Sequence, residues 1–415
     1  MKFITTNDDK KQYSHQSIVK ESNCKQIFDL IFENEGISRI EISKKTGLSR
    51  ATVSMLVDEL AEAGLINILG EGDSASSGRK PIMLEINKDR VQIITLSMMQ
   101  STFRYTLCDL KGGEIDTFLQ SVVYKKGCAK KIWNDIQDKS PHLDAEKLQA
   151  VCVAIPAKIN NAEKIINFSS VLDIQKNCDL LAELKTIQPK LPLLVGNTSS
   201  AYAYAEYKYV YNGKIDDMIF FCIGAGVGAG ILMNGRVFNG EIGHMTIDPE
   251  GPLCSCGKRG CVESLVSKTV LLREFEMIVR KNRDSHLYKL CDGDGTRIHY
   301  GNIRVALENK DPRTIEVAGR LAGKIAYCIS NVICMFNPEE IVIGCGIEEL
   351  GQTFLDMIIQ KVEIPGSNGV GSVKNMHIRY SRIESNAEAK GLFRYFLDKL
   401  FTVVTETENM IYLWN

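Results

Sequence analysis

Three cysteines lie within eight positions of one short segment, LCSCGKRGCVES at 253–264. With a histidine upstream they supply three thiolates and one imidazole, which is a standard tetrahedral set for zinc. The two glycines of this segment permit the tight turns that point sulfurs inward. The predicted ligands are His244, Cys254, Cys256 and Cys261. Four protein ligands leave no open coordination position, so we expect a structural zinc ion that holds this loop and does no catalysis.

Redox chemistry is the alternative for these cysteines. Cys254 and Cys256 are separated by one residue where redox motifs have two, and a redox pair would leave Cys261 without a role. The chain has thirteen cysteines in all, and most of them lie in apolar runs such as VCVAIP and IFFCIG. This usage predicts reduced, buried thiols in a reducing compartment and not a disulfide framework.

Two carboxylates flank the cysteine segment. Glu241 precedes His244 by three residues, and Glu263 follows Cys261 by two. A metal would hold both rigidly, and rigid carboxylates are good acceptors for the vicinal hydroxyls of a sugar. Solvated loop charges are the alternative, which is less consistent with two carboxylates beside one metal.

The elements that carry these residues have an α/β pattern. From about Arg90 onward, short β-rich runs alternate with longer helical stretches, over a length that fits two lobes. Two of the runs contain glycine-rich segments, IGAGVGAG at 223–230 and IGCG at 343–346. Both could serve as phosphate loops, because backbone amides can approach an anion where side chains are absent. By composition alone, tight β-hairpins explain them better.

The amino-terminal unit begins with a helical pattern. Residues 1–17 lack a hydrophobic period and predict a flexible tail, and a first helix is expected from Cys24. Ser38 and Glu41 form a capping box that starts a short second helix. Gly47 supplies the left-handed turn that ends it.

A third helix and a wing complete this unit. Ser49 can cap the third helix, whose apolar residues recur with helical spacing until Gly64 ends it. Two short strands at 65–69 and 81–86 surround the polar loop at 70–80. The sequence therefore predicts a winged helix-turn-helix.

Outward-facing residues of this unit are candidates for contact with double-stranded operator DNA. At the start of the third helix, Arg50 can donate two hydrogen bonds to a guanine, and Thr52 and Ser54 can reach a base or a phosphate. The other candidates are Arg39, Lys44, Lys45, Ser49, Arg79 and Lys80. Between Val19 and Lys80, however, eight Lys or Arg stand against ten Asp or Glu, so the unit has no basic excess. A protein-docking role for the module therefore stays open.

The composition excludes some classes of function. The 415 residues have a formal net charge of −1, so no global basic field would draw the whole chain onto nucleic acid or an anionic membrane. No run of eighteen apolar residues occurs, and the polar start MKFITTNDDKKQYSHQ is unlike a signal peptide. We expect a cytoplasmic protein with no membrane contact.

These motifs together resemble the ROK family of repressors and sugar kinases, in particular its xylose-repressor-like regulators. The matching segments are GLSRATVSMLVDELAEAGL, GRKP, GAGVGAG, EIGH and CSCGKRGCVE, and the resemblance runs from about residue 20 to 400. It implies a fold related to actin and hexokinase (ribonuclease H-like), with two α/β lobes and a cleft. It further implies that Glu241, His244 and Glu263 contact sugar hydroxyls, with one ring nitrogen of His244 on zinc and the other on the ligand.

The resemblance also gives an expected division of the chain into domains. We expect a flexible tail at 1–17, a winged helix at 18–88, a first lobe at 89–200, a second lobe with the zinc loop at 201–385, and a carboxyl-terminal helix at 386–415 that returns to the first lobe.

Kinases of the family carry an Asn-Asp pair whose Asp acts as base. Here Asn197 is kept, as part of the sugar-binding set, but Thr198 follows it. The first phosphate loop is also lost, with Ser97 where its Asp would stand. Ala157 replaces the Gly of a Pro-Gly pair, and Ser170 replaces an Asn that faces the sugar. The resemblance thus implies a sensor and not an enzyme.

The predicted function is a homo-oligomeric repressor of carbohydrate-utilisation genes that senses a sugar or sugar derivative. A dimer or tetramer would present two winged helices to a pseudo-palindromic operator. Two alternatives remain, an active sugar kinase with a DNA-binding extension and a regulator controlled by docking to a sugar-transport protein.

Overall fold

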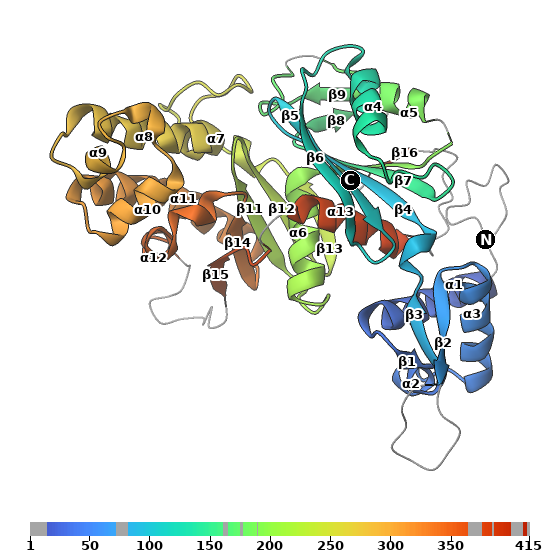
Figure 1. Ribbon diagram of the computed structural model, residues 1–415. Coiled ribbons are helices and arrows are strands. Elements are labelled where there is room, and N and C mark those ends of the chain that lie inside the picture. The colour runs from blue at the N-terminus through green and yellow to red at the C-terminus, as the bar shows by residue number, and fades with distance from the viewer. Residues whose placement is uncertain are drawn as a thin grey trace.

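The computed structural model describes residues 15–71, 82–160, 165–174, 177–188, 190–363, 376–383, 386–399 and 410–412. The predicted wing residues Arg79 and Lys80 lie outside these ranges. Figure 1 shows a winged helix-turn-helix beside an α/β body that contains two separate sheets. Among the described residues, no helix is both long and apolar enough to cross a lipid bilayer.

The winged helix-turn-helix has three helices and a three-stranded sheet of order β1-β3-β2. Its elements are α1 (His15–Glu33), β1 (Ile37–Ser38), α2 (Arg39–Thr46), α3 (Arg50–Glu62), β2 (Ile66–Glu71) and β3 (Ile82–Ile86). The expected start of the first helix at Cys24 is wrong, because α1 begins at His15, inside the expected tail. A nucleated helix extends at little cost. An ion pair of 2.8 Å between Lys20 and Glu59 of α3 supports this extension.

The predicted caps are confirmed. Ser38 and Glu41 form the capping box at the start of α2, and Gly47 ends this helix with a left-handed φ of 72°. At the start of α3, the Ser49 hydroxyl accepts a hydrogen bond of 3.1 Å from the Thr52 amide. The predicted apolar face of α3 is confirmed, with Val53, Leu56, Val57 and Leu60 fully buried and Ala61 half-buried.

The first sheet of the body has the order β16-β10-β7-β4-β5-β6. Its strands are β4 (Gln92–Met98), β5 (Thr102–Asp109), β6 (Glu114–Ser121), β7 (Leu148–Ile155), β10 (Leu193–Asn197) and β16 (Met410–Tyr412). Strands β4, β7, β10 and β16 run parallel. A small hairpin, β8 (Lys158–Asn160) and β9 (Ile165–Phe168), follows β7. One face of the sheet packs on α4 (Cys128–Lys139) and α5 (Leu180–Ile187).

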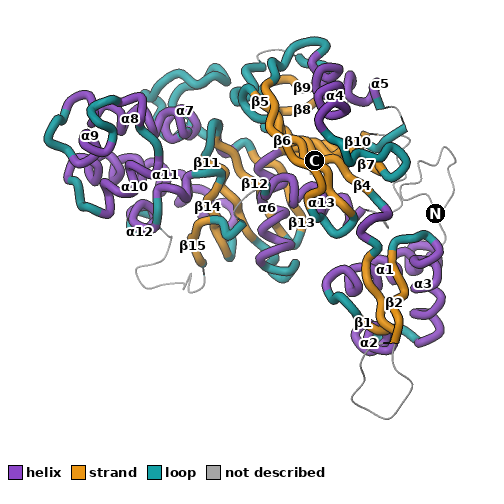
Figure 2. Tube along the Cα trace, viewed as in Figure 1, coloured by secondary structure: helices purple, strands orange, loops and turns teal. Residues whose placement is uncertain are grey.

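The second sheet has the order β13-β12-β11-β14-β15. Its strands are β11 (Met218–Ile223), β12 (Val227–Met233), β13 (Arg236–Gly240), β14 (Glu340–Gly344) and β15 (His377–Tyr380). A group of helices covers one face (Figure 2), and these are α7 (Val262–Val266), α8 (Lys268–Lys281), α9 (His286–Leu290), α10 (Tyr300–Glu308), α11 (Pro312–Phe336) and α12 (Gln352–Ile359). Ile219 and Phe221 of β11 pack toward these helices, whereas Phe220 packs toward the opposite side.

Two helices fill the space between the sheets. Helix α6 (Thr198–Ala205) contacts β11 and β12, and α13 (Ala387–Lys399) contacts β4 and β7. The two helices also pack on each other, and glycine makes this approach possible. A Cβ on Gly391 would lie 1.9 Å from the Ala201 carbonyl oxygen, and one on Gly230 would lie 2.4 Å from that of Ser199. The glycines of GAGVGAG therefore belong to the β11–β12 hairpin and its contact with α6, as their composition indicates.

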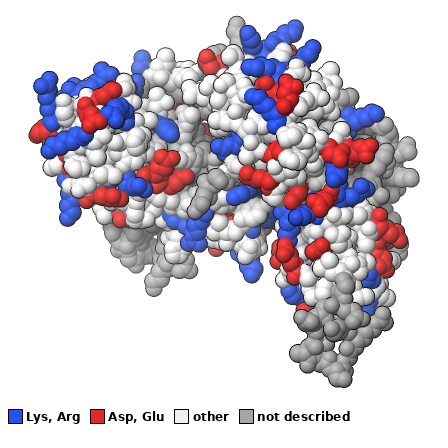
Figure 3. All heavy atoms as spheres, in the orientation of Figure 1, with Lys and Arg blue, Asp and Glu red and all other residues white. Residues whose placement is uncertain are grey.

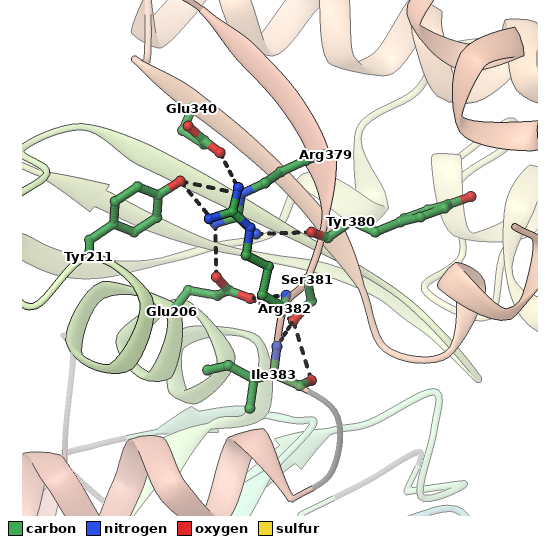
Figure 4. A network of polar contacts seen from close by, with 8 residues as sticks. All are labelled: Glu206, Tyr211, Glu340, Arg379, Tyr380, Ser381, Arg382 and Ile383. Atoms are coloured by element: carbon green, nitrogen blue, oxygen red, sulfur yellow. Dashed lines mark hydrogen bonds and ion pairs between the residues drawn. The ribbon is translucent and has the colours of Figure 1, made fainter. Parts of the chain in front are cut away.

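A π-helix, Glu206–Val210, continues α6 and is anchored to the second sheet (Figure 4). Glu206 has no exposed surface and accepts a hydrogen bond of 2.9 Å from Arg379 of β15. Arg379 also donates to Glu340 of β14 at 2.6 Å and to the Tyr211 hydroxyl at 2.9 Å. These bonds satisfy the half-buried guanidinium and tie the end of α6 to two strands.

Side chains of α1 contact the body through a second ionic cluster. Lys25 of α1 and Lys208 of the π-helix each lie 2.8 Å from a different oxygen of Asp398 in α13. Burial opposes ionisation, but Lys25, Arg394 and Lys208 outweigh it and lower the pKa of Asp398 to about 2. We call these four residues the Asp398 cluster.

The expectation of reduced thiols is wrong for one pair of cysteines. Cys222 and Cys345 are bonded to each other, with a Cα–Cα distance of 5.0 Å, and the other cysteines are free. The two residues are 123 positions apart in the chain. They meet because β11 and β14 are parallel neighbours, with Cys222 opposite Gly344. This pairing is a product of the sheet order, which cysteine spacing does not reveal.

Candidate metal centre and cleft

The four predicted metal ligands lie together. The ligand atoms of His244, Cys254, Cys256 and Cys261 are all within 4.8 Å of one another. His244 Nδ1 lies 3.7 Å from Cys254 Sγ, and Cys256 Sγ lies 3.6 Å from Cys261 Sγ. Three thiols and an imidazole at this spacing are a donor set that could hold a metal ion.

Local backbone structure explains how the loop converges. His244 ends a 3₁₀ turn, Ile242–His244, and Cys261 stands directly before α7. Gly260 has a φ of 62°, and a Cβ there would lie 1.5 Å from the Asp248 carbonyl oxygen. Only glycine fits at this position, which brings Cys261 back toward His244.

A cleft of about 970 Å³ lies between strand ends of the two sheets. Residues at or just beyond the carboxyl ends of five strands line it, namely Met98, Pro156, Asn197, Cys222 and Cys345. Ligands of open α/β sheets bind outside the carboxyl ends of parallel strands, so this is the expected place for one. The four predicted sugar-binding residues, Asn197, Glu241, His244 and Glu263, all line the cleft.

Glu263 is the most constrained of these residues. Its side chain is buried, and one carboxylate oxygen accepts a hydrogen bond of 2.9 Å from the Val227 amide. Glu241 is exposed, and its carbonyl accepts from the His244 amide at 3.0 Å. Both carboxylates therefore lie near the four predicted metal ligands. Glu263 is held by the glycine-rich turn, and Glu241 is open to solvent.

The start of α6 presents polar groups to the cleft. The Asn197 side chain caps α6 by accepting from the Ser199 amide at 2.9 Å. Thr198 Oγ1 is buried and has no hydrogen-bond partner among the described residues. Thr198 and Ser199 both line the cleft, but the prediction did not assign them to the ligand. Their position directly after Asn197, at the start of a helix, was the available signal.

Only some of the residues at which this chain departs from the kinase pattern line the cleft. Pro156, Ala157 and Ser170 line the cleft. Ser97 is buried within β4, and its neighbour Met98 reaches the cleft instead. The first-strand region thus contributes Met98 and Met99 together with the polar residues Gln100 and Ser101.

The predicted DNA-contacting residues differ in their exposure and in their polar contacts. Arg50 and Lys44 are exposed, whereas Arg39 forms an ion pair of 2.7 Å with Asp58. The hydroxyls of Ser49 and Thr52 lie 2.8 Å apart and bond to each other. The remaining described candidates are Lys45, which donates to Asn34 at 3.2 Å, and Ser54, which is half-buried. Figure 3 shows acidic and basic side chains interspersed on the face in view.

Comparisons with known proteins match both parts of the chain. Residues 127–396 match the ROK family, and residues 25–67 match a winged helix-turn-helix DNA-binding family. The xylose repressor of Caldicellulosiruptor bescii is 27% identical over 91% of this chain and 96% of its own length. The xylose repressor of Bacillus subtilis is 26% identical over 94% of this chain and 98% of its own.

A solved structure extends the likeness to the arrangement of the parts. It is a ROK family transcriptional regulator described as a homolog of the E. coli MLC protein. Its superposition has a TM-score of 0.74 at 25% identity and covers 92% of this chain and 98% of that protein.

Proposed function

The chain belongs to the ROK family, and we propose that it is a DNA-binding repressor of carbohydrate-utilisation genes that responds to a sugar. The main support for this proposal is that the same chain contains a winged helix-turn-helix and a cleft. The cleft is lined by Asn197, Glu241, His244 and Glu263. Relatives named xylose repressor are similar over nearly their whole length, which supports the same role.

We assign the start of α3 to the major groove of the operator. Arg50 is exposed there and reads a base edge, while Lys44 and Lys45 contact phosphates. The absence of a basic excess implies modest affinity for each subunit, so we expect a homo-oligomer, a dimer or a tetramer, on a pseudo-palindrome. A repressor of this kind acts on cytoplasmic DNA.

The cleft takes the sugar beside the metal cluster. Glu241 and Glu263 accept hydrogen bonds from vicinal hydroxyls. His244 directs Nδ1 toward the sulfurs, and we assign its Nε2 to a ligand hydroxyl. Zinc fits the donor set, with His244, Cys254, Cys256 and Cys261 as ligands, and it would supply a rigid closed site that fixes the loop.

We infer that the body transfers no phosphoryl group. A sugar hydroxyl needs a base near it for this reaction, and the threonine hydroxyl of Thr198 cannot take a proton at neutral pH. Thr198 Oγ1 is buried at the cleft and instead offers a hydrogen bond to a bound hydroxyl.

A thermal-shift screen of pentoses, hexoses and amino sugars tests the proposal. A sugar that binds the folded state raises the melting temperature by mass action. We expect a shift that Glu241→Ala abolishes and that Glu250→Ala, which changes an exposed carboxylate of the same loop, leaves intact. If no sugar raises the melting temperature, or if the shift survives Glu241→Ala, the assignment of the cleft fails.

A further inference from the structure

The disulfide lies in the wall of the cleft. Cys222 stands near the end of β11, and Cys345 follows the last residue of β14. Both residues are half-buried and line the cleft. They also join the two glycine-rich segments, because Cys222 precedes Gly224 and Cys345 lies between Gly344 and Gly346. Solutes that enter the cleft can therefore reach this bond.

Most other cysteines are in a different situation. Cys24, Cys108 and Cys328 are buried, and burial raises the pKa of each thiol to about 12. A thiol that stays protonated reacts slowly with oxidants. Cys334 is exposed on α11 but stands outside the cleft lining. Cys222 and Cys345 differ from these cysteines because both line the cleft and they are bonded to each other.

One short turn connects this pair to a predicted sugar-binding residue. The turn after Cys222 is closed by a bond of 2.9 Å from the Gly224 amide to the Gly226 carbonyl. Directly after it, the Val227 amide donates to Glu263 at 2.9 Å. Cys345 packs against the same turn, since a Cβ on Gly224 would lie 3.2 Å from the Cys345 carbonyl oxygen. The turn that donates to Glu263 thus lies directly beside both cysteines.

We propose that Cys222 and Cys345 are a redox-sensitive pair that sets the affinity of the cleft for its sugar. The effect on affinity rests on the proposed function, whereas formation of the bond does not. The bond holds the turn on the β14 loop and keeps Glu263 in position. Its reduction releases the turn and weakens sugar binding.

The chemistry balances with a peroxide as oxidant and a dithiol as reductant. One thiolate of the pair attacks the peroxide, and the hydroxide that leaves takes up a proton to become water. The resulting sulfenic acid condenses with the second thiol to give the disulfide and a second water. For reduction, a thiolate of the dithiol attacks one sulfur and the other cysteine leaves as thiolate. The second thiol of the reductant then resolves the mixed disulfide, and a cyclic disulfide is released.

Peptide mapping tests the bond itself in the full-length, metal-loaded protein. The protein is treated with dithiothreitol or with hydrogen peroxide at low molar excess, alkylated, digested and analysed by mass spectrometry. We expect a peptide linked through Cys222 and Cys345 after peroxide that disappears with dithiothreitol, while Cys334 is alkylated in the fully reduced sample. Alkylation of both Cys222 and Cys345 after peroxide overturns the inference.

Calorimetric titration tests the consequence for the cleft, with the sugar that gives the largest thermal shift. Reduction should raise the dissociation constant about fivefold or more, which is the lower range of coupling between sites. Cys345→Ser should bind like the reduced protein under both conditions, and Cys334→Ser should behave like the unchanged protein. Equal affinities of the oxidised and reduced protein overturn the inference.

A readout that needs no sugar separates this inference from the proposed function. Hydrogen exchange of the peptide that contains Val227 reports its bond to Glu263. We expect faster exchange after reduction. If no sugar binds in either state, the proposed function fails, and exchange that does not change on reduction then overturns the redox coupling as well.

Discussion

At the residue scale, Glu263 connects two segments that are far apart in the sequence, the cysteine segment and the glycine-rich hairpin. It follows the predicted metal ligand Cys261 by two positions and accepts a hydrogen bond from Val227 of the glycine-rich hairpin. A Cβ on Gly226 would lie 2.7 Å from the Glu263 carboxylate, so glycine is needed for this approach. The Glu263 carboxylate thus connects the loop of the predicted metal ligands to the second sheet, and Glu263 also lines the cleft.

Arg50 is the residue whose replacement tests the recognition helix. Arg50→Ala should remove most of the discrimination between operator and random DNA, because a bidentate contact with guanine contributes about 1–3 kcal/mol of specificity. Fluorescence anisotropy titrations on both DNAs measure the ratio of affinities. Lys44→Ala is the control, since loss of a phosphate contact should weaken both complexes alike. A ratio that Arg50→Ala leaves unchanged would contradict the assignment.

At the element scale, α6 is held differently at its two ends. Asn197 and Thr198 begin the helix at the cleft, and the π-helix that continues it ends in two ionic networks. Glu206 bonds to Arg379 of the second sheet, and Lys208 bonds to Asp398 of α13. π-Helices occur often at functional sites, where the extra residue re-aims side chains. Here two charged residues two positions apart point to different partners, Glu206 to Arg379 of the second sheet and Lys208 to Asp398 of α13.

The Asp398 cluster predicts a pH dependence of stability. Its folded pKa of about 2 lies below the ordinary value of 3.8. A depressed pKa stabilises the folded state above the unfolded pKa, and this contribution is lost as the pH falls from about 4 toward 2. The contribution should be about 2 kcal/mol at neutral pH. Asp398→Asn should remove it, whereas Asp138→Asn, at an exposed position of α4, should not.

Urea unfolding at pH 7 and at pH 3 measures this difference. The unchanged protein should lose more free energy of unfolding between the two pH values than Asp398→Asn does. Equal losses would mean that the cluster contributes no net stability in the folded chain.

At the scale of the whole molecule, one path of bonded elements runs from the cleft to the DNA-binding unit. Helix α6 begins at the cleft, and its π-helical continuation carries Lys208 to Asp398, which also binds Lys25 of α1. Apolar packing follows the same route, because residues of α1, α3 and α13 belong to one hydrophobic cluster. A ligand that moves the start of α6 would act on the orientation of α1.

This path predicts a reciprocal coupling between sugar and operator. The sugar should change operator affinity by a factor of about 5–150, and operator DNA should change sugar affinity by the same factor. Lys208→Met should reduce the factor without abolishing either binding event, whereas Lys214→Met, at an exposed neighbouring position, should preserve it. Anisotropy titrations with and without sugar measure the factor. Coupling that survives Lys208→Met would place the path elsewhere.

The sequence by itself determined the local features. The caps at Ser38, Gly47 and Ser49 and the buried face of α3 depend on residues a few positions apart, so their spacing predicts them. His244, Cys254, Cys256 and Cys261, a cluster that could hold a metal ion, lie in one short segment and were predicted in the same way. The resemblance of the motifs added the family and the two-lobed fold.

Only the tertiary structure decided the contacts between distant segments. The Cys222–Cys345 bond, the Glu206–Arg379 pair and the Asp398 cluster join residues that are close because strands are ordered and helices stacked as they are. Neither hydrophobic periodicity nor composition carries this order. The physical reason is that local hydrogen bonds and burial patterns fix each element, whereas contacts between distant segments depend on how complete elements pack together.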